Sequence, residues 1–442
     1  MPSRSLSFLA GEYGYNGPIL WGRGGPLKRN IAGLVIANCL FGLSFGVYEL
    51  AFPLFLDDAG VRLEAIGLVL AAAAVVNFLV VVYGGRLADS VGRKGIYGAS
   101  FLALAAANVA TPLAASVAYL TVLKTFQQTC VSVRGALRGV LVYESVAVER
   151  FTRTFGQLVG METSFHAAGY ACVGLIGAGE AGLSYQGVFI LSGAALLLAV
   201  AVFWPLFRDR PLAAPGPGVR LSLRSVFTFD LHPKLYLIVA AGFIFGMGIA
   251  MSHALWPLYF RQKFAGEWAG DLAAFGGWIG GLLPGAFGGA ASGGHGPEFA
   301  LISVVAVFHR LLLGVPMFII SPLLRSRFKW LYVGGLAVEG IMIAAPAVAD
   351  WLTGSFLVVA VTWVAHDIIG ASIWYPVQER FVQQYCRPER RATEVAKAAA
   401  LMALGVVAGQ ALAGPLMAWM PAMPFFAGGA LIVLASFILL AL

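Results

Sequence analysis

Long apolar runs recur along the whole chain, and they constrain its fold more than any other feature. They lie at about residues 31–56, 65–85, 95–116, 118–143, 155–178, 185–207, 235–260, 300–324, 330–349, 355–378, 393–418 and 423–442. A helix needs roughly 20 apolar residues to cross a bilayer, and lipid can satisfy none of its backbone polar groups. The twelve runs therefore predict an all-α membrane protein with twelve transmembrane helices.

The composition agrees with lipid as the main solvent of the chain. Of 442 residues, 60% are hydrophobic and 11% are charged, whereas soluble domains carry about 25% charged residues. The sequence has no GxxxxGK[ST] phosphate loop and no polar stretch long enough for a nucleotide-binding domain, which disfavours a pump with its own motor. The four cysteines form no CxxC pair. Cysteine-based redox or zinc chemistry is not indicated, and we expect neither a cofactor nor a bound metal.

Lysine and arginine are distributed unevenly between the two sides of the predicted helices. If the N-terminus is cytoplasmic, the outer loops contain three of the 29 basic residues and the helices contain four, which leaves 22 in the inner segments. The outer residues are Arg62, Arg261 and Lys263. This bias predicts that both termini face the cytoplasm of a multi-pass cell-membrane protein. It also accounts for the net charge of +8 without a nucleic-acid partner.

The predicted helices divide into two groups of six. We expect a cytoplasmic N-terminal segment at 1–30, a first six-helix bundle at 31–207, a cytoplasmic linker at 208–234 and a second bundle at 235–442. A glycine-rich segment at 261–299 contains a further apolar piece, but a thirteenth span there would place the next basic loop outside. We therefore interpret it as an outer loop with room for a short interfacial helix.

The two groups are related by an internal repeat. Phe41-Gly42 is followed by Pro53-Leu54-Phe55 in the first predicted helix, and Phe245-Gly246 is followed by Pro257-Leu258-Tyr259 in the seventh. The spacing is the same, and the offset between the copies is 204 residues. Such repeats are typical of secondary transporters, whose substrate site lies between the halves near the middle of the membrane.

A glycine-containing basic turn separates the second and third predicted helices. It reads Gly85-Arg86-Leu87-Ala88-Asp89-Ser90-Val91-Gly92-Arg93-Lys94. Its glycines allow close helix approach, and the carboxylate of Asp89 suits a helix N-terminus. The turn resembles the G-x-L-a-D-r-x-G-R-[KR] signature of the major facilitator superfamily.

The resemblance extends over the whole chain and implies two pseudo-symmetric six-helix bundles that work by alternating access. In that family the turn is a conformational latch, so the resemblance implies gating roles for Gly85, Asp89, Gly92 and Arg93. The corresponding turn of the second half, Ser321-Pro322-Leu323-Leu324-Arg325, has no acid. We therefore do not expect a symmetric latch.

The fourth predicted helix resembles the R-x-x-Q-G motif that is common in the drug–proton antiporters of the superfamily, with two departures. Lys124 replaces the arginine and Gln128 replaces the glycine. A buried lysine can lose its proton near neutral pH, whereas arginine cannot. The glycine ladder that ends in Gly-Pro is missing from the fifth helix, and a partial version ends at Gly414-Pro415 on the eleventh. The chain thus resembles the antiporter-like branch only in part.

Ionisable residues inside the predicted helices are costly in lipid, so each is a functional candidate. The alternative role for any one of them is a structural ion pair. Four bases, four acids and four histidines lie there: Lys124, Arg134, Arg138, Arg310, Glu49, Glu162, Glu339, Asp367, His166, His253, His309 and His366.

Two of these residues occupy corresponding positions of the repeat. In this superfamily helices 1, 4, 7 and 10 line the cavity, and Glu49 of helix 1 matches His253 of helix 7 at the repeat offset. We predict that the pair shares proton coupling. The alternatives are local packing for Glu49 and a hydrogen bond to a carbonyl for His253.

The fourth and fifth helices contribute a second group. Lys124, Arg134 and Arg138 share one broad face of helix 4, and Glu162 and His166 are neighbours on helix 5. We expect Glu162 to neutralise one of the two arginines. The Glu-x-x-x-His spacing alone does not indicate a metal site.

On the tenth predicted helix, Trp363, Asp367 and Trp374 follow helical spacing. An acid between two indoles suits an organic cation or a flat ring. The alternative is ordinary packing with an ion pair between Asp367 and Arg310. Glu339 lies on an outer helix of the family and is expected to be structural, and His309 is expected to pack.

The sequence predicts a secondary active transporter, not an enzyme, that exports small amphipathic organic compounds in exchange for protons. We expect a monomer in the bilayer, with a small-molecule substrate and protons as its partners. The predicted substrate and proton site comprises Glu49, Lys124, Arg134, Glu162, His166, His253, Arg310, Trp363, Asp367 and Trp374.

Two alternatives remain open at this stage. Four buried cations could bind an organic anion, which would be imported with protons. A protein of another class, such as a transport-inactive sensor or a lipid-modifying enzyme, is disfavoured because the sequence has no HExxH motif, no paired aspartate motif and no signalling domain at either end.

Overall fold

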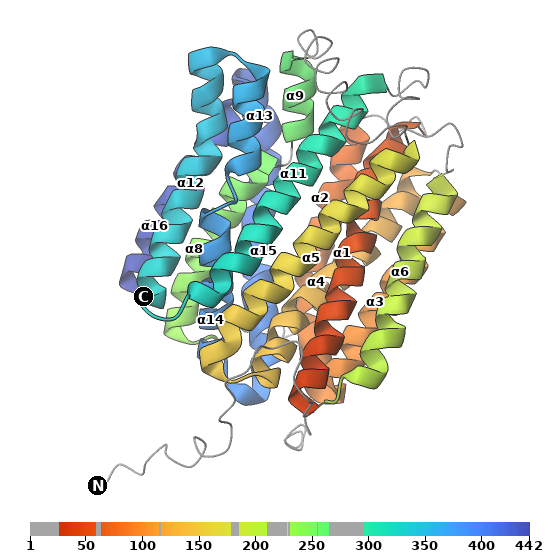
Figure 1. Cartoon of the computed structure of the whole chain (residues 1–442), viewed down its shortest axis with the longest axis vertical. Helices are drawn as coiled ribbons and strands as arrows, with labels where there is room; N and C mark the ends of the chain where they lie inside the picture. Colours follow the sequence, from red (N-terminus) through yellow and green to blue (C-terminus); the bar gives the residue numbers. More distant parts are fainter. Residues whose placement is uncertain are drawn as a thin grey trace.

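The computed structural model describes residues 26–58, 63–114, 116–177, 185–209, 228, 230–253, 255–264 and 296–442. The regular secondary structure in these ranges is helical, and most of the helices run along the long axis of the molecule (Figure 1). The helices before the predicted linker are α1 (Pro26–Asp58), α2 (Leu63–Val91), α3 (Arg93–Ala110), α4 (Val117–Ser145), α5 (Val148–Gly177) and α6 (Tyr185–Leu206). Those after it are α8 (Pro233–His253), α9 (Trp256–Phe264), α11 (Gly296–Ile320), α12 (Phe328–Thr353), α13 (Phe356–Ala365), α14 (Gly370–Tyr385), α15 (Arg391–Trp419) and α16 (Met423–Ile438).

Nine stretches of the described residues are long and apolar enough to cross a membrane. The predicted all-α membrane fold is thereby confirmed. α4 and α5 are 29 and 30 residues long but are not among the nine. Both helices contain charged residues within their length, so their polar groups must be satisfied by neighbouring helices rather than by lipid.

Two of the predicted helices are interrupted in the second half. The run at 235–260 is divided between α8 and α9, and Pro257 in the first turn of α9 disfavours a continuous helix through this point. The run at 355–378 is confirmed as one candidate membrane span, Phe356–Tyr385, which is divided between α13 and α14. Residues 366–369 form a turn, in which Ile368 N–H donates to the carbonyl of Ala365.

Several predicted segments lie outside the described residues. They are the N-terminal segment up to residue 25, most of the linker, and residues 265–295 of the glycine-rich outer loop with its interfacial helix. α9 ends at Phe264 and α11 begins at Gly296 on either side of that loop. These domain boundaries therefore stay predictions.

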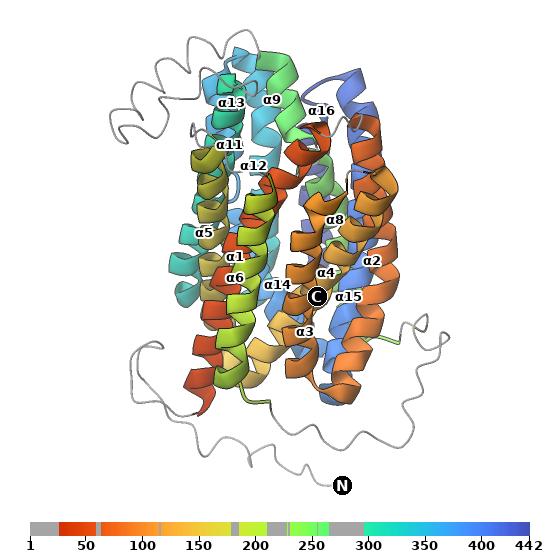
Figure 2. The same cartoon turned by 90° about the vertical axis from the view of Figure 1, so that its right-hand side faces the viewer.

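Two close helix pairs connect the first six helices with the later ones. α5 packs along α11, and α2 packs along α15. The two pairs lie on different sides of the molecule, as the views in Figures 1 and 2 show. Small residues make both approaches possible, because a Cβ atom on Gly160 would lie 2.6 Å from the carbonyl oxygen of Gly314. A Cβ on Gly85 would lie 2.5 Å from the carbonyl oxygen of Ala392.

The contact between α5 and α11 can be tested with a single methyl group. Gly160→Ala should lower the free energy of unfolding by roughly 1–3 kcal/mol, because the added Cβ meets backbone atoms that cannot rotate away. Gly135→Ala in α4 is the matched control, since no heavy atom lies within 4 Å of its Cβ position. Thermal unfolding in detergent, followed by tryptophan fluorescence, measures both. A stable Gly160→Ala variant would contradict the close approach.

Candidate functional site

The carboxylate of Glu49 on α1 is contacted by side chains of α5 and α11. The phenol of Tyr170 donates a hydrogen bond to Glu49, and Nε2 of His166 lies 2.7 Å from the same carboxylate. Arg310 of α11 approaches it with its guanidinium 3.8 Å away. The side chains of Glu49 and Arg310 are 39% and 26% exposed. They are therefore accessible, although both lie well inside their helices.

Lys124 of α4 lies near this group, within electrostatic reach of Glu49. Its ammonium donates a hydrogen bond to Gln127 at 2.7 Å and lies 5.0 Å from the ring centroid of Tyr48 and 5.3 Å from that of Phe52. No acid lies within ion-pair distance of it among the described residues. The lysine is thus held by an amide and two aromatic faces.

A buried acid pairs with two arginines one helical turn apart. Glu162 of α5 contacts Arg134 at 2.8 Å and Arg138 at 2.6 Å. Arg134 also donates to Asn38 at 2.6 Å and stacks on Phe41, whose ring centroid is 3.4 Å from the guanidinium carbon. The cluster holds two positive charges and one negative charge, so it is cationic overall.

The same cluster extends to the second half of the chain. Arg138 donates a hydrogen bond of 2.8 Å to the phenol of Tyr375 on α14. Nearer the end of the bundle, Arg380 of α14 donates to the carbonyl oxygen of Val148, where α5 begins. Each of these bonds joins one half of the chain to the other, so both must break if the halves separate at this end.

Three histidines of the second half gather around Asp367. His309 Nε2 lies 2.8 Å from Asp367 Oδ2, and His366 Nε2 lies 3.4 Å from Asp367 Oδ1. The ring of His253 lies 5.6 Å from that of His309 and 5.1 Å from that of His366. The alternative ion pair between Asp367 and Arg310 is not found, and His309 is a polar partner rather than a packing residue.

The two tryptophans of the predicted aromatic site lie in different surroundings. Trp363 is fully buried, and its ring packs on His253 at 4.7 Å. Trp374 packs on Phe245 at 4.4 Å. The turn at 366–369 breaks the helical spacing on which the prediction rested. Asp367 is therefore contacted by histidines, and the predicted arrangement of an acid between two indoles is wrong.

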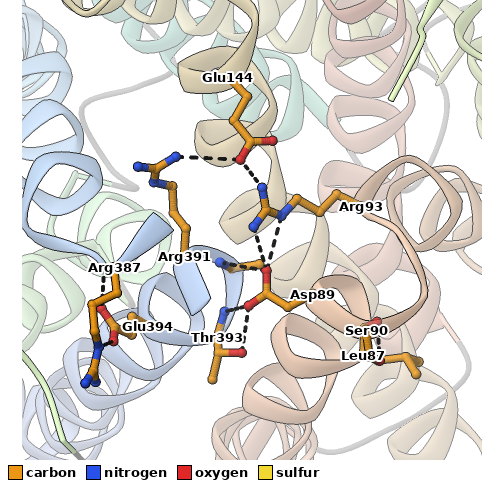
Figure 3. A network of polar contacts seen from close by, with 10 residues as sticks. Leu87, Asp89, Ser90, Arg93, Glu144, Arg387, Arg391, Thr393 and Glu394 are labelled. Atoms are coloured by element: carbon orange, nitrogen blue, oxygen red, sulfur yellow. Dashed lines mark hydrogen bonds and ion pairs between the residues drawn. The ribbon is translucent and has the colours of Figure 1, made fainter. Parts of the chain in front are cut away.

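The basic turn at 85–94 contacts the first turn of α15 (Figure 3). The carboxylate of Asp89 accepts hydrogen bonds from the backbone N–H groups of Ala392 at 3.3 Å and Thr393 at 2.8 Å. It also pairs with Arg93 at 2.8 Å. Arg93 in turn pairs with Glu144, at the end of α4. Asp89 thereby caps a helix of the other half of the chain.

The two glycines of the turn serve its geometry. Gly85 lets α2 approach α15 closely, as described above. Gly92 has a φ of 122°, which is unfavourable for a residue with a side chain, and α3 begins immediately after it. We call the end of the bundle that contains this turn the latch end.

The structure thus divides the predicted site residues into three groups and two separate residues. The groups are Glu49, His166 and Arg310; Arg134 and Glu162; and His253, Trp363 and Asp367. Lys124 makes no ion pair with these groups but lies within electrostatic reach of Glu49, and Trp374 packs on Phe245. The sequence did not lead us to predict that Tyr170 donates a hydrogen bond to Glu49. Tyr170 stands four residues after His166 and therefore on the same face of α5, which is the signal that could have identified it. Nothing in the sequence indicated that Tyr375 meets Arg138.

Comparison with known proteins agrees with this architecture. The Major Facilitator Superfamily profile matches residues 34–324, so the chain belongs to the major facilitator superfamily. The crystal structure of the human organic anion transporter MFSD10 (TETRAN) superposes with a TM-score of 0.70 at 14% identity and covers 94% of this chain and 100% of that one. No curated protein matches the sequence. The family membership and the membrane-spanning helices together identify the protein as a multi-pass membrane transporter.

Removal of the acid in the cationic cluster tests whether the cluster stabilises the fold. Glu162→Gln leaves two buried guanidinium groups without a counter-charge, which typically costs about 3–5 kcal/mol of stability. Glu149→Gln, in the exposed first turn of the same helix, should have almost no effect. Thermal unfolding of the purified proteins measures the difference. Equal stability of the two variants would mean that Glu162 is dispensable for the charge balance.

Proposed function

We propose that the protein couples the movement of protons to the transport of a small organic anion, with Glu49 as the proton-binding residue. The observation that carries this proposal is the contact of Glu49 with Arg310, because the two side chains come from different halves of the chain. Alternating access requires contacts at the substrate site whose energy differs between the two states. An ion pair between the halves meets this requirement.

The chemistry of the coupling follows from competition for one guanidinium. When Glu49 is ionised, it is a partner of Arg310. When Glu49 takes up a proton, Arg310 loses that partner and is free to bind the carboxylate or phosphate of a substrate. His166 at 2.7 Å and the phenol of Tyr170 stand next to the carboxylate and can receive or return the proton.

The charges around this site favour an anion over a cation as the substrate. Glu49 and Glu162 are both engaged by bases, whereas Lys124 has no acid within ion-pair distance in the described part of the chain. The arginine pair around Glu162 adds a further net positive charge. The human transporter of similar fold also handles organic anions, and at 14% identity this is a supporting analogy.

The sequence-based prediction of proton-coupled export of amphipathic compounds uses the same proton site. It differs in the charge of the cargo and in the direction of movement. Transport measured with a panel of organic anions, organic cations and neutral amphipathic compounds distinguishes the two proposals. We retain import of an anion with protons as the reading that the buried cations favour.

The first experiment measures proton movement in proteoliposomes with an imposed pH gradient and an enclosed pH-sensitive dye. An organic anion from the panel should discharge the gradient through the wild-type protein. Glu49→Gln should abolish the discharge, because the neutral amide cannot bind or release a proton and leaves Arg310 without its ionised partner in both states. Movement of the labelled anion without any proton flux would overturn the coupling.

Two controls accompany this measurement. Glu149→Gln changes an exposed acid on α5 and should transport like the wild type. Arg310→Gln should abolish movement of the anion itself, because the substrate then loses its guanidinium. If Arg310→Gln transports normally while Glu49→Gln does not, the substrate binds elsewhere and the competition mechanism is wrong.

We further propose that the contact of Asp89 with α15 closes the latch end while the substrate site is reached from the opposite end. Its hydrogen bonds to Thr393 and Ala392 form only when the halves meet there. A hydrogen bond to a charged group contributes about 1.5–3 kcal/mol. Loss of the charge should therefore move the population towards the state that is open at the latch end.

The buried thiol of Cys386, beside the latch, reports on this opening. Asp89→Asn should raise the rate at which a maleimide labels Cys386 by roughly tenfold, the factor that corresponds to about 1.4 kcal/mol. Ser90→Ala is the neighbouring control, since its hydroxyl bonds to the carbonyl of Leu87 within the same turn. Labelling at each cysteine is quantified by mass spectrometry. An unchanged rate at Cys386 in Asp89→Asn would contradict the gating role.

A further inference from the structure

A group of metal-ligating side chains lies in the second half of the chain beside Arg310, whose guanidinium acts electrostatically on His253, His309 and Asp367. The potential donor atoms of His253, His309, His366 and Asp367 all lie within 4.8 Å of one another. His309, His366 and Asp367 are buried. Three imidazoles and one carboxylate form a donor set that suits a first-row divalent metal such as Zn²⁺.

The hydrogen bonds of two of these histidines fix which nitrogen is available. Nδ1 of His253 lies 3.0 Å from the carbonyl oxygen of Ile249, and Nδ1 of His366 bonds to the carbonyl oxygen of Trp363. A carbonyl only accepts, so each Nδ1 carries the proton and each Nε2 has a free lone pair. A hydrogen bond from the second ring nitrogen to a backbone carbonyl is the usual support of a metal-bound histidine.

The free lone pair of His366 faces another acceptor. Its Nε2 is buried, has no hydrogen-bond partner among the described residues, and lies 3.4 Å from Asp367 Oδ1. Two acceptors that face each other in a buried site repel unless a cation or an added proton lies between them. A cation or a proton between His366 Nε2 and Asp367 Oδ1 would relieve this repulsion.

A second acid stands next to the cluster. Glu339 of α12 is 1% exposed, and its carboxyl group lies within hydrogen-bonding reach of Asp367 and of the backbone of Ala371. The acid that acts on it is Asp367, and its side chain packs against Gly370, directly after the turn. Two neighbouring buried carboxyl groups are stable only if they share a proton or if a cation binds beside them.

The backbone supports the same conclusion. His366 and Asp367 belong to the turn at 366–369 that separates α13 from α14. Non-helical backbone at membrane depth is tolerated where it is enclosed by protein or surrounds a bound group. His253 is the last residue of α8, and His309 lies in α11. The four side chains thus come from three separate parts of the second bundle.

We propose that His253, His309, His366 and Asp367 bind one divalent transition-metal ion, with Zn²⁺ as the best fit to the donor set. The ion links the end of α8, the middle of α11 and the turn between α13 and α14. A tetrahedral zinc site needs donor atoms about 3.3 Å apart, so the side chains draw together by roughly 1 Å or more when the metal enters. The proposal does not depend on what the protein transports.

The test uses the full-length protein with an affinity tag that contains no histidine, freed of metal with EDTA and kept in detergent. Co²⁺ is added as a spectroscopic probe, and bound metal is measured by elemental analysis. We expect about one Co²⁺ per chain with the visible absorption of a four-coordinate site, and displacement of that absorption by Zn²⁺. No saturable absorption, or an affinity in the millimolar range, would overturn the proposal.

Variants assign the ligands. Asp367→Asn and His366→Ala should each weaken binding by at least about tenfold. His232→Ala is the matched control, because His232 stacks on Tyr385 away from the cluster. Equal affinity in all four proteins would place the metal elsewhere and refute the assignment.

A further measurement needs no variant and therefore does not depend on whether the variants fold. X-ray absorption of the zinc-loaded wild-type protein should show imidazole scattering from three histidines. Zn²⁺ should also raise the thermal unfolding temperature, since it binds the folded state. A spectrum without imidazole ligands would leave the cluster as a protonated pair of His366 and Asp367, and the proposal would fail.

Discussion

The cost of burying charge in a low-dielectric bundle governs the arrangement of this protein. An unpaired ion inside the membrane region is expensive, and removal of one partner from a buried pair is more harmful than the absence of both. Glu162 is held by Arg134 and Arg138, and Glu49 by Arg310, His166 and Tyr170. Because these partners come from different helices, the positions of α1, α4, α5 and α11 are tied to one another by electrostatics as well as by packing.

The polar contacts between the two halves are arranged in levels along the bundle. The latch end has Asp89 on the first turn of α15, and further inside Arg138 donates to Tyr375. Near the middle, Arg310 reaches Glu49. All three contacts join one half to the other, but only the middle one involves a carboxylate that is substantially exposed. The contact between Glu49 and Arg310 is therefore the accessible one of the three while the latch end is closed.

The features that were predicted from the sequence are those encoded locally. Apolar runs gave the helices, and the four-residue spacing of Glu162 and His166 correctly made them neighbours on α5. The break at 366–369 could not be predicted from the apolar pattern, because that pattern continues through it. His309 and Asp367 are 58 residues apart, and no local pattern indicates that they meet. The same holds for Arg138 and Tyr375, which belong to different halves.

The cap that Asp89 provides has a consequence for α15 itself. No side chain of its own N-terminal residues caps the helix, so its first N–H groups depend on a carboxylate that belongs to the other half. A capping interaction contributes about 0.5–2 kcal/mol to helix stability. When the halves part at this end, the first turn of α15 must fray or find water. Part of the energy of the closed state thus resides in the hydrogen bonds of a single helical turn, so separation of the halves carries a cost within α15 as well as at the interface.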